Sequence, residues 1–570
     1  MQSTKENNSP GKIFAEYEAG VRFKASLGSR GLYEQNKINE RFYTGDQWFE
    51  AKCGKDRPLV RYNIIKRIGE YKMASIGTIP IAVNYRAEGI PDTLTHREQA
   101  EAVRAALRNG GEDTFSGDPT PQEISLILSG FSDFFKTTAE RVEFDRLREQ
   151  ALRNAYITGT GVIYSYWDES APTGLYADRE KRCPILGDVS CEVLDIENVY
   201  FGEPNNENIQ TQPYIILAQR KTVAEVRREA KRNGRTAEEL SKITPDRSFR
   251  HMAGDISSLE PEDSKRILVL TKLYKAWSRD LNDYEIRAVR VCRDVVIRED
   301  WSMGIRLYPL ACFLWERRHS CAYGESEITW LVPNQIAINR MLTASVWSGM
   351  MMGMPIMVVD GDLVDQPVTN DPAQIIRVQG GGENVSSAVQ FVNPPEFSGQ
   401  FGTAISSLIE QTLTQAGANA AALGDIAPNN TSAIIALREA ATMPMQLFRN
   451  RFFSFCEDVA RIWGELWLSM YGKRSLRIED EGGVWYLPFD GARYRNLILN
   501  TRIDVGAASA WSELASVKIL DGLFEKGVIT AEQYLERLPK GTVPGCDALL
   551  RRLRADETIP LQEGGQADER

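Results

Sequence analysis

The spacing of apolar residues predicts helices in the first 160 residues of the chain. Residues 13–50 fit a helix followed by an aromatic-rich turn, with Gly45 at its bend. Helical spacing resumes over 63–77, and a longer amphipathic helix is predicted over 134–157. The apolar positions of this longer helix are Ala139, Val142, Leu147, Ala151 and Ala155. We expect it to stop at the segment Thr158-Gly-Thr-Gly161.

After this segment the period of the pattern becomes that of β-strands. Short runs rich in β-branched and aromatic residues are separated by clusters of Pro, Gly and Asn. These runs cover 162–167, 189–194, 214–218, 266–277, 284–297 and 307–315. Between them, 221–240 is predicted to be a charged surface helix and 245–264 a polar loop. The pattern up to about residue 324 therefore predicts a body of class α+β.

The middle of the chain has a different order of elements. A helix is predicted over 325–350, then strand and turn over 351–393, then a second helix over 402–416. Gly417 can supply the C-terminal cap of this second helix. The following residues, 418–432, are small and polar.

A third long helix is predicted from about residue 433 to 471. At 1.5 Å per residue it is ~55–60 Å long, which is too long for one small core. Pro444 should kink it. Strand-like alternation returns over 476–505, and two further helices are predicted over 511–538. The last ten or so residues are acidic and glycine-rich, which is typical of a disordered tail.

One stretch, 341–359, has no charged residue over 19 positions. That length could cross a bilayer. Pro355, Gly349 and Gly353 interrupt it, together with several Ser and Thr. We therefore favour a helix buried between protein neighbours and followed by a strand. A membrane-spanning helix is the alternative, and detergent dependence would reveal it.

Size and charge limit the class of protein. The chain has 570 residues, enough for two to four folding units. Hydrophobic residues make up 42% and charged residues 26%, which is typical of a globular protein with a sizeable core. The formal net charge is −10, the wrong sign for a protein that holds nucleic acid mainly through its phosphates.

No recognisable catalytic pattern occurs in the sequence. It contains no phosphate-binding loop, no Gly-x-Ser-x-Gly elbow and no His-Glu-x-x-His helix, and its three histidines lie far apart. The eight cysteines lack the spacing of a zinc site, so we predict free thiols in a reducing compartment. The polar N-terminus shows no signal peptide. We therefore predict a structural protein that is not an enzyme, without catalytic residues, metal or cofactor.

Five short motifs follow one another along most of the chain. They are Phe42-Tyr-x-Gly-Asp-Gln-Trp48 followed by Arg57-Pro and Asn63, then Ala155-Tyr-Ile-Thr-Gly-Thr-Gly161, then Tyr323-Gly-Glu-Ser with Gln335 and Asn339-Arg340, then Gly424-Asp-x-x-x-Asn-Asn-Thr-Ser432, and finally Gly527-Val-Ile-Thr with Tyr534-Leu-Glu-x-Leu-Pro539. Each is weakly specific alone. Their colinear order resembles the portal, or head-to-tail connector, family of tailed bacteriophages. The short C-terminus and Ala433, where many relatives carry Gly, depart from that pattern.

The resemblance implies the portal fold in a dodecameric ring. This fold has an α+β wing, a two-helix stem, a small α/β clip, a long kinked wing helix and a short helical crown. The implied boundaries are 1–324 for the wing, 325–350 and 394–417 for the stem helices, 351–393 for the clip, 418–432 for the tunnel loop, 433–510 for the long helix and returning wing strands, 511–558 for the crown and 559–570 for the disordered acidic tail. The implied site residues are Asn419, Asp425, Asn429, Asn430 and Thr431 in the tunnel loop and Gln335, Asn339, Arg340 and Glu410 in the stem.

The resemblance also implies a function and partners. A portal ring at one capsid vertex is the channel for DNA packaging, retention and ejection. The implied partners are double-stranded DNA in transit, the terminase large subunit, the major capsid protein, the scaffolding protein and the head-to-tail adaptor. We therefore expect the chain in the virion, and in the host cytoplasm during assembly. An acidic channel fits this role, because each phosphate that a wall neutralises would hold the moving DNA back.

Two further classes stay open. Another virion structural protein, such as an adaptor or minor head protein, would not explain the helix–strand–helix order of 325–417. An enzyme, such as a nuclease or a terminase-like ATPase, would need a metal-binding carboxylate cluster or measurable ATP turnover.

Overall fold

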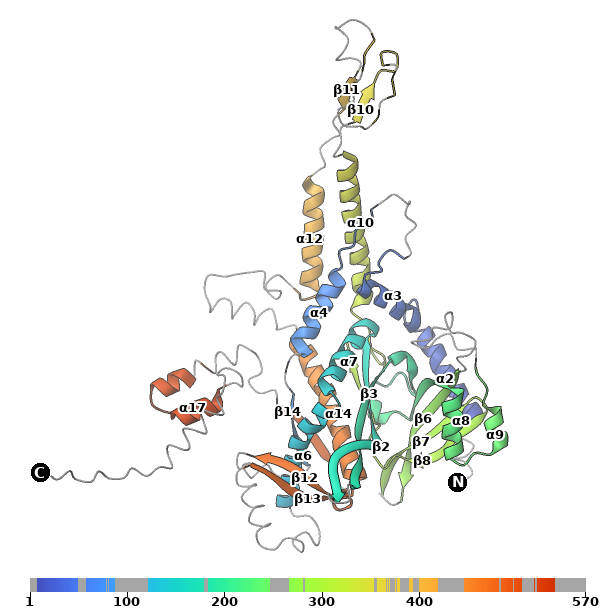
Figure 1. The fold of residues 1–570 in the computed structure, drawn as a ribbon, viewed down its shortest axis with the longest axis vertical. Helices are drawn as coiled ribbons and strands as arrows, with labels where there is room; N and C mark the ends of the chain where they lie inside the picture. Colours follow the sequence, from blue (N-terminus) through green and yellow to red (C-terminus); the bar gives the residue numbers. More distant parts are fainter. Residues whose placement is uncertain are drawn as a thin grey trace, which may run out of the picture.

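The computed structural model combines helices and strands in class α+β, as the pattern predicts (Figure 1). It describes residues 8–49, 58–77, 79, 81–87, 121–178, 183–246, 266–279, 282–352, 356–364, 389–392, 399–418, 445–480, 483–495, 497–504, 517 and 520–538, with a few positions between 366 and 379. The elements form a body, a pair of helices that projects from it and a small hairpin beyond the far ends of that pair (Figure 1).

The largest sheet of the body has five antiparallel strands in the order β4-β5-β6-β7-β8. The strands are β4 (Val199–Phe201), β5 (Tyr214–Thr222), β6 (Arg266–Ser278), β7 (Asp283–Cys292) and β8 (Val295–Ser302). Alternate residues of β6 face opposite sides: Leu268 packs with the cluster of Ile13 and Tyr17, whereas Val269 packs with Val226. The run expected over 284–297 is thus a hairpin of β7 and β8 rather than one strand.

A second sheet has three antiparallel strands in the order β3-β2-β9. Its strands are β2 (Thr160–Asp178), β3 (Cys183–Leu194) and β9 (Leu310–Leu314). Gly161, at the start of β2, lies so close to the preceding helix that a Cβ atom would be 2.1 Å from the carbonyl oxygen of Ala151. The glycine-rich helix stop is therefore also a close approach between helix and sheet, which needs glycine.

Seven helices of the described body precede or border these sheets. They are α2 (Pro10–Ala25), α3 (Leu32–Thr44), α4 (Ile64–Gly77), α6 (Pro121–Arg141), α7 (Phe144–Thr158), α8 (Val223–Arg232) and α9 (Ala237–Lys242), with the 3₁₀ turns η2 (Ile196–Asn198) and η3 (Ile209–Thr211) nearby. The single helix predicted over 134–157 is wrong, because Glu143 has a left-handed φ of 53° and separates α6 from α7. The single helix over 221–240 is also wrong, because Gly234 turns the chain with a φ of 78° between α8 and α9.

A long helix, α14 (Gln446–Met470), crosses the body and supplies the centre of its core (Figure 1). Trp463 and Trp467 are fully buried and contact aromatic rings of α6 and α7. The described helix is the second part of the one predicted over 433–471. Its first part and the kink predicted at Pro444 lie outside the described residues.

Shorter elements complete the body. They are the antiparallel pairs β1 (Ala82–Ala87) with β14 (Leu499–Asp504) and β12 (Lys473–Asp480) with β13 (Gly483–Asp490), and the helix α15 (Gly491–Tyr494). The short helix α17 (Ala531–Arg537) lies apart from the body (Figure 1). The prediction of strands over 476–505 is confirmed. Near the C-terminus, residues 520–525 and α17 are helical and Gly527 turns between them with a φ of 67°, as predicted for this pair.

The projecting pair consists of α10 (Ile328–Met352) and α12 (Gly399–Gln415), and the hairpin consists of β10 (Ile356–Val359) and β11 (Val389–Val392). The uncharged stretch 341–359 is thus the end of a helix followed by a strand. Across the described ranges, no helix combines the length and apolar character needed to cross a membrane. Gly417 caps α12 with a φ of 74°, and the amide of Ala418 bonds the carbonyl of Leu413, as predicted.

Candidate functional site

The helices α10 and α12 run antiparallel and lie side by side along their length (Figure 1). Near the body, the Asn334 amide donates to Thr412 Oγ1 at 3.4 Å, and the buried Thr412 hydroxyl donates to the carbonyl of Leu408 at 2.7 Å. The pair places the β10–β11 hairpin at the end of the described structure that is farthest from the body (Figure 1). The candidate site is therefore this projection and the contacts that hold its base.

Gln335, predicted as a stem residue, lies at this base and is 1% exposed. Its Oε1 accepts the backbone N–H of Ile64 at 3.0 Å, and its Nε2 donates to the carbonyl of Tyr62 at 2.7 Å. One amide side chain thus satisfies both a donor and an acceptor of the segment that leads into α4. An irregular segment needs such partners when it is buried, because its backbone groups have none in a helix or sheet.

Asn339, also predicted as a stem residue, continues the same arrangement one turn along α10. Its Oδ1 accepts the N–H of Tyr62 at 3.1 Å, and its Nδ2 donates to Gln47 Oε1 at 2.6 Å. A further turn on, Thr343 Oγ1 accepts the N–H of Val60 at 3.1 Å. Polar residues four apart share one face of a helix. We call Gln335, Asn339 and Thr343 the polar clasp, since together they hold the 60–64 segment against α10.

The first sequence motif supplies the other half of this contact. Gln47 also donates to the carbonyl of Phe42 at 3.0 Å, and Asn63 donates to the carbonyl of Tyr43 at 3.0 Å. Gly45 ends α3 with a φ of 96°, a left-handed conformation that favours glycine. The motif therefore folds as a turn whose amide side chains bond backbone groups and the polar clasp.

The second and third motifs pack directly against each other where α10 begins. The Thr160 hydroxyl accepts the N–H of Gly324 at 2.9 Å, and the Ser326 hydroxyl donates to the carbonyl of Tyr156 at 2.5 Å. A Cβ atom at Gly324 would lie 2.2 Å from the carbonyl oxygen of Gly159. Glycine at both positions allows the end of α7 and the segment that leads into α10 to touch.

A buried ion pair fixes the same junction, and the sequence reasoning missed it. Lys72 of α4 lies 2.6 Å from Glu327, and Trp315 donates to the other oxygen of this carboxylate at 3.1 Å. Burial raises the pKa of Glu327, while the charge and hydrogen bond of Lys72 act to lower it. The available signal was a lysine on the apolar face of a predicted helix, at four-residue spacing from Ile68 and Ile76.

The remaining predicted site residues lie elsewhere. Arg340 is exposed on α10, beside a cavity of about 160 Å³ that Trp48 and Phe49 also line. Glu410 is exposed on α12 and is not part of the polar clasp. The predicted tunnel-loop residues lie outside the described residues: Asn419, Asp425, Asn429, Asn430 and Thr431. Their role stays a prediction.

The outer half of α10 has a different character from its base. It carries no charged residue after Arg340, and Val346 and Met350 are 42% and 61% exposed. The helix α12 covers one side of α10, and Val346 and Met350 stay exposed in the single chain.

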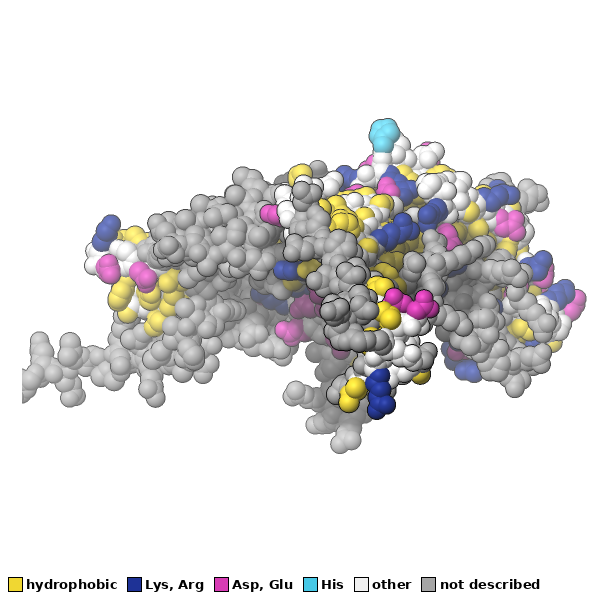
Figure 2. Space-filling model, turned by 90° about the horizontal axis from the view of Figure 1, so that it is seen from above, with side chains coloured by type: hydrophobic (Ala, Val, Ile, Leu, Met, Phe, Trp, Pro, Cys, Tyr) yellow, Lys and Arg dark blue, Asp and Glu magenta, His cyan; other side chains and the backbone are white. Residues whose placement is uncertain are grey.

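Chemistry-bearing groups are scattered rather than gathered. Within the part of the chain that the structure describes, no group of three or more His, Cys, Asp or Glu side chains could hold a metal ion. The described cysteines are free thiols. Seen from the hairpin end, Lys and Arg side chains are interspersed with Asp and Glu over the described surface (Figure 2).

Comparison with known proteins gives no family to which the chain can be assigned. No family model matches it, and no curated protein is significantly similar to it.

Proposed function

We propose that this chain is the portal protein of a tailed bacteriophage, whose copies form a ring-shaped DNA channel at one capsid vertex. The observation that carries the proposal is the projection: an antiparallel helix pair leaves an α+β body and ends in a small β-hairpin (Figure 1). In a portal these parts are the wing, the stem and the clip. The five sequence motifs follow the same order.

The contacts at the base of the helix pair support a stem role. A stem must keep a fixed direction relative to its wing, since the stems of neighbouring subunits line one channel. The polar clasp and the buried pair of Lys72 and Glu327 fix α10 to α4 and to the segment before it. Because the bonded residues lie far apart in sequence, tertiary contacts fix the direction of α10 relative to the body.

The surface of α10 supports a ring. Its exposed apolar residues, Val346 and Met350, need cover that the single chain does not supply. In a closed ring each stem lies between two others, so one side of the helix pair is covered by the preceding copy and the opposite side by the next copy, in a head-to-tail contact. The net charge of −10 supports a channel through which DNA slides without being held.

In this proposal the hairpin end is the clip, which docks the terminase large subunit during packaging and the head-to-tail adaptor afterwards. The energy for DNA movement comes from the terminase. The channel-facing role of Asn419, Asp425 and Asn429 belongs to this proposal as a hypothesis. Packaging at the normal level after Asp425 is replaced and 418–422 is shortened would contradict it.

Negative-stain electron microscopy with native mass spectrometry tests the proposal. We expect rings with a central hole and about twelve subunits. Because some rings need other capsid components to assemble, the protein is examined both alone and after co-expression with scaffolding and major capsid proteins. A chain that stays monomeric under both conditions would overturn the proposal and favour an adaptor or an enzyme.

A further inference from the structure

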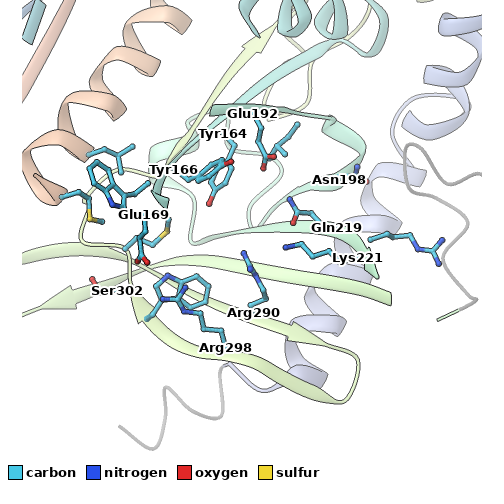
Figure 3. Close-up of a pocket in the computed structure, with 18 of the residues that line it drawn as sticks. Tyr164, Tyr166, Glu169, Glu192, Asn198, Gln219, Lys221, Arg290, Arg298 and Ser302 are labelled. Carbon is cyan, nitrogen blue, oxygen red and sulfur yellow. The ribbon is translucent and has the colours of Figure 1, made fainter. Parts of the chain in front are cut away.

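A cleft of about 780 Å³ lies in the body, between the three-stranded sheet and the five-stranded sheet. Its walls come from β2 and β3 on one side and from β5, β6, β7 and β8 on the other, and Leu466 and Met470 of α14 close one end. Figure 3 shows Tyr164, Tyr166 and Glu192 extending from the first sheet toward Lys221, Arg290 and Arg298 of the second. A volume of this size suits a small-molecule ligand.

The wall from the five-stranded sheet is strongly cationic. Its cations are Arg220 and Lys221 on β5, Arg266 on β6, Arg290 on β7 and Arg298 on β8. The acidic residues that line the cleft are Glu169 and Glu192. This excess of positive charge occurs in a chain whose net charge is −10, so it is a local feature and not a property of the whole surface.

Two of the arginines stand directly opposite each other. Arg290 and Arg298 are cross-strand partners in the β7–β8 ladder. Like charges in that position destabilise a sheet unless an anion lies between or beside them. Glu229 of α8 provides one carboxylate, which pairs with Arg290 and lies 3.9 Å from Lys221. That single carboxylate is shared by two cations, and it does not reach Arg298.

Arg298 is held in place without a carboxylate partner. Its guanidinium lies 4.1 Å from the ring centre of Trp301, over the indole. No carboxylate lies within ion-pair distance of it in the described ranges. By contrast, the nearby Arg287 pairs with both Glu285 and Asp300 at 2.9 Å. A guanidinium stacked on an aromatic ring keeps its planar fork of donors available for an anion such as phosphate.

The opposite wall offers rings and a hydrogen-bond acceptor. Tyr164 and Tyr166 stack on each other, with ring centres 5.4 Å apart, on the face of β2 that lines the cleft. Asn198 also lines the cleft, and its Oδ1 is buried without a hydrogen-bond partner among the described residues. A buried acceptor without a donor is costly, so it favours a ligand that brings an N–H group.

We propose that this cleft binds a nucleotide. Arg298 and Arg290, with Lys221, hold the phosphate by charge-assisted hydrogen bonds. The tyrosine pair packs against the base, and Asn198 accepts a hydrogen bond from an exocyclic amino group or ring N–H. An acidic peptide would use the cations alone. A nucleotide uses the cations, the rings and the unpaired acceptor together, which is why we favour it. The site involves the body only and does not depend on the ring.

Isothermal titration calorimetry on the full chain tests the site, with adenosine 5′-monophosphate (AMP) as the first probe. We expect AMP to bind at micromolar to sub-millimolar concentration, and ribose 5-phosphate and adenosine each to bind more weakly. AMP, guanosine, cytidine and uridine monophosphates are compared to identify the preferred base. A 5′-phosphorylated single-stranded tetranucleotide distinguishes a free nucleotide from the end of a nucleic-acid strand as the natural source.

Variants locate the site. Arg298→Gln and Asn198→Ala should each weaken binding of the best nucleotide about tenfold or more. The matched control is Arg293→Gln, an exposed arginine in the turn between β7 and β8 that does not line the cleft, and it should leave binding unchanged. Melting temperatures check that each variant folds, and Lys221→Gln replaces any that does not.

Three results would overturn the proposal. The first is the absence of binding by every nucleotide and by the tetranucleotide up to millimolar concentration. The second is nucleotide binding that Arg298→Gln and Asn198→Ala leave unchanged. The third is binding of a Glu-rich peptide that depends on Arg298 when no nucleotide binds, which would assign the cleft to an acidic polypeptide.

Discussion

Lys72 illustrates how single residues organise the junction between the helix pair and the body. It occupies the apolar face of α4, where every fourth residue is otherwise isoleucine: Ile64, Ile68 and Ile76 are all buried. The sequence shows that a lysine there needs a buried partner. It does not show which one, because Glu327 follows 255 residues later and meets Lys72 only through the tertiary fold.

Removing one partner of this pair should be costly. Because the other charge would then stay buried without compensation, Glu327→Gln or Lys72→Met should destabilise the folded chain by about 3–5 kcal/mol. The double variant should recover much of that loss, since it buries no charge. Urea unfolding of the wild type, both single variants and the double variant measures the coupling. If the double variant lost as much unfolding free energy as the two single variants together, the pairing would be contradicted.

A second carboxylate, the half-buried side chain of Glu197, predicts a pH dependence. Burial is the main reason why the pKa of Glu197 rises from 4.5 to about 7, with Asp195 adding to the rise and Asn36, Lys24 and Lys37 opposing it. Between these two pH values the folded chain keeps a proton that the unfolded chain has released. Stability therefore falls as pH rises through this window, by up to about 3 kcal/mol.

Glu197→Gln should remove this dependence, because the glutamine is neutral throughout and can still accept the hydrogen bond of Asn36. We expect the variant and the wild type to be similar in stability near pH 4.5 and the variant to be the more stable near pH 8. Unfolding free energies at several pH values check this. Parallel curves for the two proteins would contradict it.

At the scale of elements, local patterns predict the strands and the projecting helices. They do not predict the breaks between α6 and α7 and between α8 and α9. The apolar positions predicted over 134–157 step by five residues between Val142 and Leu147. That step departs from the helical period at the point where α6 ends and α7 begins. The break between α8 and α9 coincides with the dipeptide Asn233-Gly234, a common turn signal. In both places, overall helical character hid a local turn signal.

A substitution at Glu143 tests the break between α6 and α7. Its left-handed φ of 53° costs a residue with a side chain about 1–2 kcal/mol, a cost that glycine does not have. Glu143→Gly should therefore stabilise the protein by about 1 kcal/mol, even after the exposed ion pair with Arg146 is lost. The matched control is Glu149→Gly, at an exposed position inside α7, which should destabilise by about 1 kcal/mol. Thermal unfolding of both variants shows whether the signs differ.

At the scale of the whole molecule, the sequence predicts which elements exist better than which surfaces meet. Local patterns predict the helix–strand–helix order of 325–417, and only the resemblance to the portal family implies that these elements project as a stem and clip. Asn339 of the polar clasp bonds Gln47, 292 positions earlier in the chain, and the cleft between the two sheets is lined by both Tyr164 and Trp301. Sheet order and the packing of one sheet on another create such sites, and no local pattern encodes them.

The exposed apolar side of α10 leads to a prediction about ring formation. Val346→Asp and Met350→Asp should each prevent ring formation while leaving the melting temperature of the monomer nearly unchanged, because these side chains are exposed in the single chain. The matched controls are Val346→Leu and Met350→Leu, which keep the apolar character and should form rings. Native mass spectrometry measures the oligomeric state of the aspartate variants and of the leucine controls. Rings in the aspartate variants would contradict an interface at this surface.

The polar clasp also has a mechanical consequence. α10 has 25 residues and is therefore ~37 Å long, so it acts as a lever arm between the hairpin and the body. A sideways load on the hairpin is resisted at the base by hydrogen bonds to the 60–64 segment and by the Lys72–Glu327 pair. Gln335, Asn339 and Thr343 lie on successive turns of α10, and Glu327 directly precedes the helix, so these contacts oppose the load together. A torque applied to α10 is thus transmitted through these contacts to α4 and to the core behind it.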